Sequence, residues 1–456
     1  MAFYTKKRQP RIFMGLSEVA GYYRHLKAGF DALGVPNTFF EPVPHKFAYH
    51  KPSALQQWVA PIILRSDAIK KKKSVERSYL RLLLTALQWL VFAYMALTHD
   101  VFIYGYRTTF DGAFVGKRRY RDIALLKAWG KTVIYVFHGS DARPPYLNGN
   151  YQDDTPETLA IRTQDRVASI TAIERTADVV VNHPPTSLLH KKPVVQWSAV
   201  GIPFSGEESV STQSPAAGDP VRILHAPSIQ KTKGTPAVRA AIETLKTEGH
   251  AIDFVELVNV PNHQVISYLQ KTDILVDELY SDTFLAGLAT EAAYYGVPTV
   301  VCGLEHDLMA ATMTPSFIPP AMTGPPDALV DNLHALISDA PRRKALGLSA
   351  QQYVRQQWAP AAVAQRFLRL CRNDIPAEWW YDPNTDTPYV GGWGLAAPDR
   401  HSVLTNHMHY AQQLAAQGGP SVLTTLGVNA PIFAALQASL QTNASPSLVQ
   451  EPLPVA

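Results

Sequence analysis

The chain has 456 residues, of which 46% are apolar and 18% charged, and its formal net charge is +4. This small positive excess excludes a dedicated nucleic-acid binder, and the two cysteines, Cys302 and Cys371, exclude a disulfide framework and a cysteine-based zinc site. The length exceeds what one hydrophobic core organises, so two domains with appendages are expected. So few cysteines also favour a reducing compartment, and the expected location is the cytoplasm.

Short β-branched or aromatic runs alternate with helical stretches in the first part of the chain. The strand candidates are RIFMGL (11–16), NTFFEP (37–42), VFIYGY (101–106), TVIYVF (132–137) and ADVVVNH (177–183). After the first run, Tyr22, Leu26 and Phe30 recur at helical spacing, and Gly34 ends the helix. The alternation predicts βαβ units and a parallel sheet, in a first domain of residues 1–205.

One uncharged segment runs from Leu82 to Thr98 and follows four consecutive lysines, Lys70 to Lys73. Three interpretations fit it: a buried core helix, a helix on an anionic membrane surface, and a membrane-spanning helix. A spanning helix needs about 20 such residues, so the segment is short. Its length and flanks favour the buried core helix, and peripheral contact with the inner face of the membrane is the second expectation.

The stretch 206–220 is rich in Ser, Gly and Pro, has no apolar periodicity, and is predicted to be an interdomain linker. The alternation then restarts, with strand candidates VRILHA (221–226), IDFVELV (252–258), DILVDEL (273–279) and PTVVCG (298–303). A second doubly wound domain is therefore predicted over 221–372, helical from about residue 331. Residues 373–456 form an extension whose end, 444–456, has little to bury and is predicted to be disordered.

Ligands of doubly wound sheets bind beyond the carboxyl ends of the strands. The loop HAPSIQKTKGT (225–235) places Lys231 and Lys233 after a strand and before a helix, which predicts a diphosphate site. Glu291 lies on a helix predicted from near Phe284 to Gly296, where a carboxylate can accept both hydroxyls of a ribose. The alternative is that Glu291 only provides a favourable charge near the start of a helix. The lysine loop upstream favours the ribose-binding role over this alternative.

The second half of the chain resembles a known family. Lys233 and Gly234 after HAPS, the strand DILVDEL and the block TEAAYYGVPTVV (290–301) are similar to the donor-binding half of family 4 glycosyltransferases. The similarity covers residues 221–372, and extends more loosely to the first domain through Gly21 and VFHGSDARP (136–144). It implies the GT-B fold, in which two Rossmann-like domains face each other across a cleft.

The resemblance also implies an activity. Family 4 enzymes are retaining, so the expected reaction moves a hexose from a UDP- or GDP-sugar to a glycan, lipid-linked or small-molecule acceptor, as in polysaccharide biosynthesis. No metal or other cofactor is expected, and the adjacent Asp153 and Asp154 do not form the D-x-D pattern of metal-dependent glycosyltransferases. In this family the leaving phosphate is thought to help deprotonate the acceptor on the same face.

Residue roles follow from the same motifs. Donor-binding roles are implied for Lys231, Lys233, Gly234, Gly287 and Glu291. His138 is expected to project from the first domain onto the donor sugar as a catalytic residue. Gly21, Asp141 and Arg143 are predicted to contact substrate. The equal alternatives are a structural ion pair of Arg143 with Asp141 or another acid, and a role in the turn alone for Gly21.

Two features depart from the family pattern. The first acidic residue of the motif falls on Thr283, so Asp282 is predicted to take its catalytic place, with Asp277 and Glu278 as alternatives. The arginine that often precedes the lysine is missing, so Lys231 is expected to supply the second positive charge. Two alternatives therefore stay open: an inactive relative that serves as a binding or scaffold subunit, and a nucleotide-sugar epimerase or hydrolase.

Overall fold

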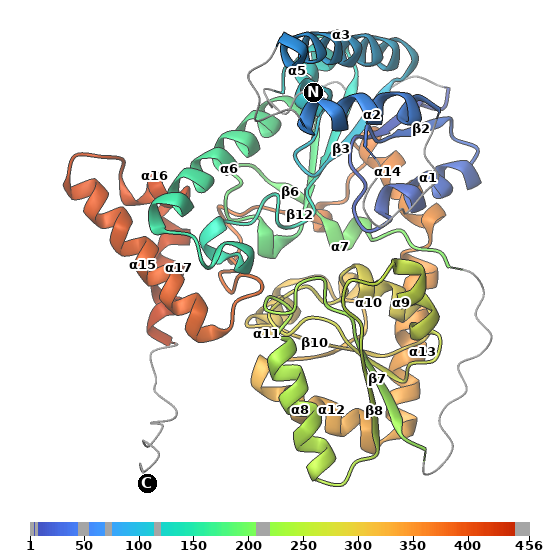
Figure 1. Ribbon diagram of the computed structural model, residues 1–456, viewed down its shortest axis with the longest axis vertical. Coiled ribbons are helices and arrows are strands. Elements are labelled where there is room, and N and C mark those ends of the chain that lie inside the picture. The colour runs from blue at the N-terminus through green and yellow to red at the C-terminus, as the bar shows by residue number, and fades with distance from the viewer. Residues whose placement is uncertain are drawn as a thin grey trace.

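The computed structural model describes residues 4, 8–43, 54–68, 75–113, 120–206 and 219–442. Two parallel sheets, each covered by helices, form two domains that lie one above the other in Figure 1. This architecture confirms the predicted fold class, an α/β protein with two Rossmann-like domains. Most of the predicted linker, residues 207–218, falls outside the described residues. So does the end predicted to be disordered, residues 444–456.

The first domain is built on a seven-stranded sheet in the order β12-β6-β5-β4-β3-β1-β2. Its strands are β1 (Ile12–Gly15), β2 (Asn37–Phe40), β3 (Val101–Gly105), β4 (Thr132–Val136), β5 (Val179–Asn182), β6 (Val194–Gln196) and β12 (Trp380–Tyr381). Its helices are α1 (Tyr22–Ala32), α2 (Ala54–Ala68), α3 (Val75–Thr98), α4 (Phe110–Ala113), α5 (Arg121–Ala128), α6 (Pro156–Thr176) and α7 (Trp197–Val200). The five predicted strands coincide with β1 to β5, whereas β6 and β12 were not predicted.

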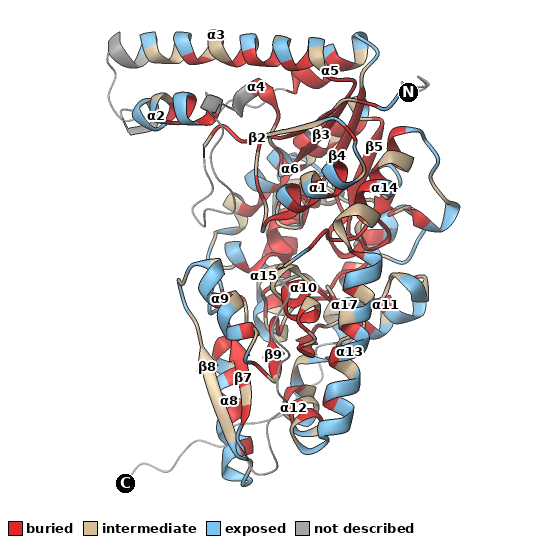
Figure 2. Cartoon of the chain, turned by 90° about the vertical axis from the view of Figure 1, so that its right-hand side faces the viewer, coloured by how far each residue is buried: buried red, intermediate tan, exposed pale blue. Residues whose placement is uncertain are grey.

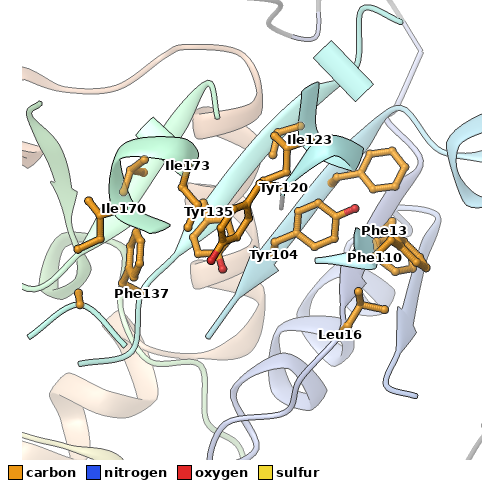
Figure 3. Packing of buried hydrophobic residues seen from close by; sticks show 14 of the residues in the cluster. Phe13, Leu16, Tyr104, Phe110, Tyr120, Ile123, Tyr135, Phe137, Ile170 and Ile173 are labelled. Carbon is orange, nitrogen blue, oxygen red and sulfur yellow. The ribbon is translucent and has the colours of Figure 1, made fainter. Parts of the chain in front are cut away.

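Alternation along the strands gives this sheet a core on each face. In β1, Phe13 packs on one face, whereas Ile12 and Met14 pack on the other. Figure 3 shows the aromatic cluster on the first face, where Tyr104 and Phe110 lie beside Phe13 with ring centroids 6.2 and 5.2 Å away. Burial of both faces is what a helix-covered parallel sheet requires, and it holds the loops at the carboxyl edge in place.

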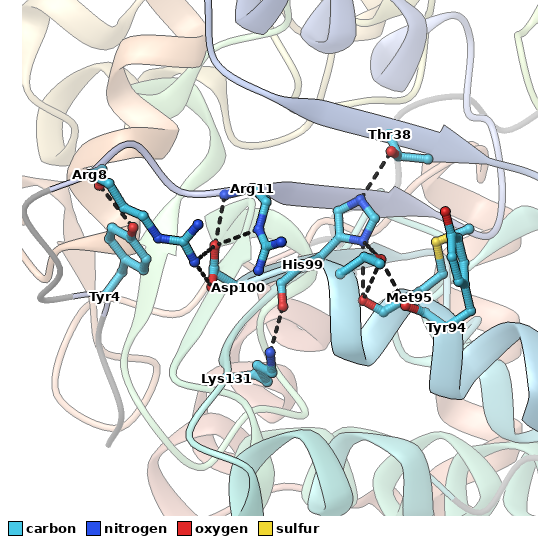
Figure 4. A network of polar contacts seen from close by, with 10 residues as sticks. Tyr4, Arg8, Arg11, Thr38, Tyr94, Met95, His99, Asp100 and Lys131 are labelled. Atoms are coloured by element: carbon cyan, nitrogen blue, oxygen red, sulfur yellow. Dashed lines mark hydrogen bonds and ion pairs between the residues drawn. The ribbon is translucent and has the colours of Figure 1, made fainter.

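The residues ahead of β1 are anchored by the buried carboxylate of Asp100, next to β3 (Figure 4). Arg8 Nη2 donates to its two oxygens at 3.0 and 3.1 Å, and the Arg11 backbone N–H donates at 3.1 Å. Burial acts to raise the pKa of Asp100, but the hydrogen bonds from Arg11 outweigh it, and the pKa lies below its ordinary value. Beside it, His99 Nε2 lies 3.0 Å from Thr38 Oγ1. The start of the chain, β2 and β3 are thereby held together.

Helix α3 lies along the outer edge of the first domain, with α2 beside it (Figures 1 and 2). Its inner face is buried, but its outer face exposes Leu82, Leu90 and Leu97 to 69%, 69% and 78%. The stretch Ser78–Thr98 is long and apolar enough to cross a membrane, the only such helix in the described parts of the chain, and 33% of its apolar window is buried. The favoured prediction of a buried core helix is therefore right for one face only.

The second domain contains a five-stranded parallel sheet in the order β11-β10-β9-β7-β8. Its strands are β7 (Val221–His225), β8 (Ile252–Glu256), β9 (Ile274–Val276), β10 (Thr299–Cys302) and β11 (Met322–Gly324). Its helices are α8 (Thr235–Thr247), α9 (Asn262–Leu269), α10 (Gly287–Tyr294), α11 (His306–Thr312), α12 (Leu329–Ser338) and α13 (Ala340–Gln357). The four predicted strands correspond to β7 to β10, and the short β11 was not predicted.

The chain returns to the first domain after α13. Helix α14 (Pro360–Cys371) packs so closely on α1 that a Cβ on Gly29 would lie 2.0 Å from the Pro360 carbonyl oxygen. Strand β12 then pairs with β6, antiparallel, at the edge of the first sheet. The second domain therefore ends near residue 358, which corrects the boundary predicted at 372.

The two crossings between the domains lie side by side. The Phe204 N–H donates to the Trp358 carbonyl at 3.2 Å. Gly201 has a φ of +95°, and a Cβ there would lie 2.5 Å from Cδ1 of Trp358, so only glycine fits against this ring. Both connections thus pass through one contact.

The extension, described through residue 442, forms a helical appendage beside α6 (Figure 1). Its helices, α15 (Ala397–Ala416), α16 (Val422–Leu426) and α17 (Ala430–Thr442), share a core with Tyr146 and Leu147 of the first domain. Ahead of α15, the Trp393 N–H donates to the Leu147 carbonyl at 3.0 Å and the Gly394 N–H donates to the Tyr280 carbonyl at 2.8 Å. The extension therefore contacts both domains at the cleft.

Candidate functional site

Two adjoining cavities lie between the domains, at the carboxyl ends of strands from both sheets. The Lys233 cavity, about 280 Å³, is formed by residues that follow β7, β8 and β9, by α9 and α10, and by Ala20 of the first domain. The Arg143 cavity, about 220 Å³, is formed by loops after β4 and β5, by residues of the second domain between 278 and 286, and by Trp393 of the extension. Glu278 and Ala286 line both cavities, so the cavities meet there.

Lys233 lies at the centre of a buried charge cluster. Its Nζ is 3.1 Å from Asp277 Oδ1 and donates a short hydrogen bond to Glu278. Burial acts to lower the pKa of Lys233, but the carboxylates of Asp277 and Glu278 outweigh it and raise the pKa above its ordinary value. Burial raises the pKa of Asp277, whereas Lys233 outweighs burial at Glu278 and lowers its pKa. Lys233 therefore stays cationic at neutral pH.

Glu291 lies in the second turn of α10 and lines the same cavity. Its two carboxylate oxygens accept hydrogen bonds from Asn262 Nδ2 at 3.0 and 3.2 Å. Burial raises the pKa of Glu291 to about 7. The cavity wall beside it carries the apolar side chains Leu257, Val260, Val265 and Leu288. An apolar wall next to a carboxylate and an ammonium group suits a nucleoside diphosphate, whose base is flat and whose ribose and phosphates are polar.

Two of the predicted glycines shape this cavity. Gly234 precedes α8 with a φ of +74°, and a Cβ there would lie 2.6 Å from Leu279 Cβ. Gly287 begins α10 and lines the cavity, where an added Cβ would lie 3.3 Å from Ala20 Cβ in the first domain. Both positions therefore allow a close approach of backbone that a larger residue would prevent.

The first domain contributes His138, directly after β4. Its Nε2 lies 2.9 Å from the Tyr23 hydroxyl, and the ring also contacts Tyr22, with centroids 5.1 Å apart. Burial lowers the pKa of His138 to about 3, so the imidazole is neutral at pH 7. His138 lines the Arg143 cavity, across from Glu278 and Thr283 of the second domain.

Asp141 supports the loop that carries His138. Its Oδ1 accepts a hydrogen bond from the His138 backbone N–H at 2.8 Å. Burial raises the pKa of Asp141 to about 6. Among the described residues it forms no ion pair with Arg143 within 4.0 Å, and it is not a lining residue of either cavity. The alternative of a structural ion pair is therefore wrong, and Asp141 orients the loop instead of facing the cleft.

Three predicted residues lie away from the cavities. Lys231 is exposed, and its Nζ lies 3.3 Å from Asp153 of the first domain. Gly21 precedes α1, but the N–H groups of Tyr23 and Arg24 in the first turn already bind the Glu18 carboxylate at 3.1 and 3.0 Å. Neither residue makes the substrate contact that was predicted. The Lys231 side chain faces solvent, and the backbone N–H groups after Gly21 already bind the Glu18 carboxylate.

Asp282 is the third of these residues. Its Oδ1 accepts a hydrogen bond from the Glu305 N–H at 2.7 Å, on the side that faces the extension. Burial and the nearby Glu305 carboxylate raise the pKa of Asp282 to about 7. Glu305 in turn accepts from the N–H groups of Val390 and Gly391 at 3.0 and 2.7 Å. Asp282 thus helps to hold the extension, and this position does not support the predicted catalytic role.

Glu278, which the sequence left as an alternative to Asp282, is the carboxylate that faces both cavities. In addition to Lys233, it accepts a hydrogen bond from Trp393 Nε1 at 2.8 Å. Asn262 and Trp393 were not predicted at all. A signal existed for Glu278 in its position directly after β9, but none existed for Trp393, which reaches the site from 115 residues away.

Within the described parts of the chain, no group of three His, Cys, Asp or Glu side chains is placed to hold a metal ion. The carboxylates nearest the Lys233 cavity are already engaged by Lys233, Trp393 and Asn262. Lys233 is the one cationic side chain among the residues that line this cavity.

No protein-family model and no curated protein matches this chain. Solved structures are similar to it at low sequence identity. The glycotransferase of kitacinnamycin is 15% identical, with 80% of this chain and 100% of that chain covered and a TM-score of 0.43. Trehalose-6-phosphate synthase OtsA is 10% identical, with coverages of 81% and 100% and a TM-score of 0.46. The HepE protein of Anabaena, solved in complex with UDP-glucose, is 11% identical, with coverages of 80% and 99% and a TM-score of 0.40. At these values the likeness is one of fold alone.

Proposed function

We propose that this protein is a glycosyltransferase that moves a sugar from a nucleoside diphosphate donor to a hydroxyl group of an acceptor. The observation that carries the proposal is the Lys233 cavity, in which a cationic lysine and the Glu291 carboxylate flank an apolar wall. The adjoining Arg143 cavity, between the two domains, is the place for the sugar and the acceptor. A site divided between two facing domains suits a reaction of two substrates.

The chemistry needs charge stabilisation at the leaving group. The bond from the anomeric carbon to the β-phosphate oxygen breaks, a bond to the acceptor oxygen forms, and the acceptor proton leaves with the nucleoside diphosphate. Lys233 stabilises the negative charge that grows on the phosphate, Glu291 accepts hydrogen bonds from the ribose, and Glu278 accepts them from the sugar. Because Lys233 meets the phosphates directly, we propose that the reaction is independent of metal ions.

We further propose that the anomeric configuration is retained. Inversion needs a general base on the acceptor side. The two histidines that line the Arg143 cavity, His138 and His183, each have a pKa lowered to about 3 by burial and are poor bases near pH 7. The bond of His138 to Tyr23 and its place at the cavity suit a contact with a sugar hydroxyl instead. The leaving phosphate then receives the acceptor proton.

The decisive experiment is calorimetry with UDP, GDP and ADP, followed by product analysis with the matching nucleotide sugars, with and without EDTA. We expect one nucleoside diphosphate to bind, and transfer to a hydroxyl acceptor to proceed with retention in EDTA. Absence of binding by any of the three would contradict the proposal. Binding without transfer or hydrolysis would favour a scaffold subunit, and an altered free sugar would identify an epimerase or hydrolase.

We also propose that the protein works at the inner face of a membrane, with helix α3 in the lipid interface. The outer face of α3 repeats exposed apolar residues at helical spacing, Tyr79, Leu82, Leu90, Tyr94 and Leu97, and α2 adds Trp58 at 79% exposure. An apolar stripe of this kind binds between lipid head groups and acyl chains. Lys70 to Lys73, which connect the two helices in the sequence, and Arg65 at the end of α2 favour anionic lipids. A lipid-linked acceptor would be reached from this position.

Replacing Leu82, Leu90 and Leu97 by Gln is expected to abolish binding to vesicles that contain anionic lipid. These three side chains are exposed, so their loss removes apolar contact with lipid without opening the core. Co-sedimentation with phosphatidylglycerol vesicles measures the effect, and Ile161→Gln, at 65% exposure on α6, is the matched control. Wild-type protein that stays in the supernatant would contradict the proposal. A triple variant that changes only from dimer to monomer, with no change in vesicle binding, would also contradict it, because the apolar face would then be a dimer interface.

A further inference from the structure

The guanidinium group of Arg143 is buried without a partner. Arg143 follows β4 in the loop HGSDAR, is 6% exposed, and lines the Arg143 cavity. None of the three guanidinium nitrogens forms a hydrogen bond or ion pair with a described residue, and Nε is fully enclosed. The guanidinium packs on the ring of Trp393, whose centroid lies 5.3 Å from Arg143 Cζ.

The other buried arginines of the described chain each have at least one acceptor. Arg107 binds Asp165 and Ser169, and Arg166 donates to the carbonyls of Ser140 and Arg143. Arg343 donates to the Leu336 carbonyl, and Arg400 donates to the Val390 carbonyl and Ser439 Oγ. Single nitrogens of Arg107, Arg166 and Arg400 are also enclosed without a partner, but Arg143 is the one of these five whose guanidinium has no acceptor at all among the described residues.

An unpaired buried cation weakens a fold, because desolvation is not repaid. Burial lowers the pKa of Arg143 to about 10, against the opposing effect of Glu278 and Asp141, so the group is still charged at neutral pH. Glu278 forms no ion pair with it within 4.0 Å, because its two oxygens are turned to Lys233 and Trp393 Nε1. Because the Arg143 guanidinium lowers the stability of the fold and lines a cavity, we expect it to bind a ligand.

The remaining lining of the cavity suits an anion. Ser140 and Asn150 offer hydrogen-bond donors, and Trp393 covers one face of the guanidinium. A planar guanidinium binds phosphate or carboxylate through two parallel N–H donors. The donor diphosphate has its own cation, because Lys233 lies in the adjoining cavity.

We propose that Arg143 forms a second anion site, which binds a phosphate or carboxylate group carried by the sugar or by the acceptor. This inference rests on the proposed function, since the donor defines what else enters the cleft. It gives that function a substrate class: either the transferred sugar is a uronic acid, or the acceptor bears a phosphate. Neutral sugars and neutral acceptors would leave the guanidinium unpaired.

The test compares wild-type protein with Arg143→Met by calorimetry and thermal unfolding at constant ionic strength. One arm titrates UDP-glucuronate against UDP-glucose, and the other titrates glucose 1-phosphate onto protein saturated with UDP; if GDP or ADP is the nucleotide that binds, it and its sugar conjugates replace those of UDP in both arms. We expect one arm to show an affinity that falls about 10- to 100-fold in Arg143→Met, while UDP itself binds both proteins equally. The arm that responds identifies whether the sugar or the acceptor carries the anion.

Stability gives an independent readout. Without ligand, Arg143→Met is expected to unfold at the same temperature as wild type or above it, because it removes an unpaired buried charge. Arg162→Met is the matched control, since Arg162 also stacks on an aromatic ring, Tyr151, but is exposed and paired with Asp154. It should leave both arms unchanged.

Three results would overturn the inference. The first is a marked fall in the unfolding temperature of Arg143→Met, which would make Arg143 structural. The second is a loss of UDP affinity in this variant, which would assign Arg143 to the diphosphate. The third is that neither arm depends on Arg143 although UDP binds. Failure of the proposed function is distinct, because then the wild-type protein binds no nucleoside diphosphate.

Discussion

Replacing Lys233 with Ala is expected to reduce glycosyl transfer by roughly 10²- to 10³-fold and to destabilise the fold by about 3–5 kcal/mol. The first effect follows from the loss of the cation that faces the leaving phosphate. The second follows because Asp277 and Glu278, both buried, lose the ammonium group that lies 3.1 Å from Asp277 and closer still to Glu278. Initial rates and urea denaturation measure the two effects separately.

A double substitution separates stability from catalysis. In Lys233→Met with Glu278→Gln, one charge of each sign is removed, so most of the lost stability should return while transfer stays absent. Lys246→Ala on α8 is a control, since Lys246 is exposed and pairs only with exposed Glu243, a contact worth at most about 1 kcal/mol. If Lys233→Ala transfers sugar at the wild-type rate, Lys233 does not act on the donor.

Glu291→Gln is expected to stabilise the unliganded protein and to weaken nucleotide binding. Burial raises the pKa of Glu291 from 4.5 to about 7, so the folded protein holds a proton that the unfolded chain releases at lower pH. Stability therefore falls as the pH rises from about 4.5 to about 7 and is constant above that range. Gln removes this loss, for a gain of up to about 3 kcal/mol above pH 7 and none below pH 4.5.

Binding is expected to change in the opposite direction. The carboxylate accepts hydrogen bonds from ribose hydroxyls, and its loss should lower the affinity for the nucleoside diphosphate by roughly 10- to 100-fold. Affinity of the wild type should rise between pH 6 and pH 8 by the ionisation of Glu291, and that of Glu291→Gln should not. Calorimetry at both values measures this, with Glu243→Gln as the exposed control. Equal affinities of wild type and Glu291→Gln would remove Glu291 from the ribose site.

The alternation of strands and helices in both domains could be predicted from the sequence. Buried parallel strands are uniformly apolar and separated by helices, so β1 to β5 and β7 to β10 could be located from short β-branched runs. Strands β6, β11 and β12 have two or three residues each, which is too short for a pattern to be recognised. The return of α14 to the first domain could not be foreseen, because helical periodicity shows that a face is apolar but not which partner covers it.

The same contrast between local pattern and tertiary contact explains which site residues could be predicted. Lys233, Glu291 and His138 lie in loops or in the first two helical turns after strands, where parallel topology brings them to one edge. Asp282 was preferred to Glu278 by its distance along the chain from Glu291, yet the tertiary contact with Glu305 turns it toward the extension. Trp393 and the isolation of Arg143 depend on contacts between distant segments, which no local pattern encodes.

The side-by-side crossings at Phe204 and Trp358 make the second domain an insertion within the first, because α14 and β12 complete a sheet that began at β1. A single cut in the polypeptide therefore cannot yield two self-sufficient halves: a fragment of residues 1–205 would leave α1 uncovered and the edge of β6 open. The second domain differs in this respect, because residues 219–358 contain all five strands of its sheet and the helices α8 to α13 that cover it. The chain crosses between the lobes at the Phe204–Trp358 contact, and the appendage that carries Trp393 contacts both lobes at the cleft.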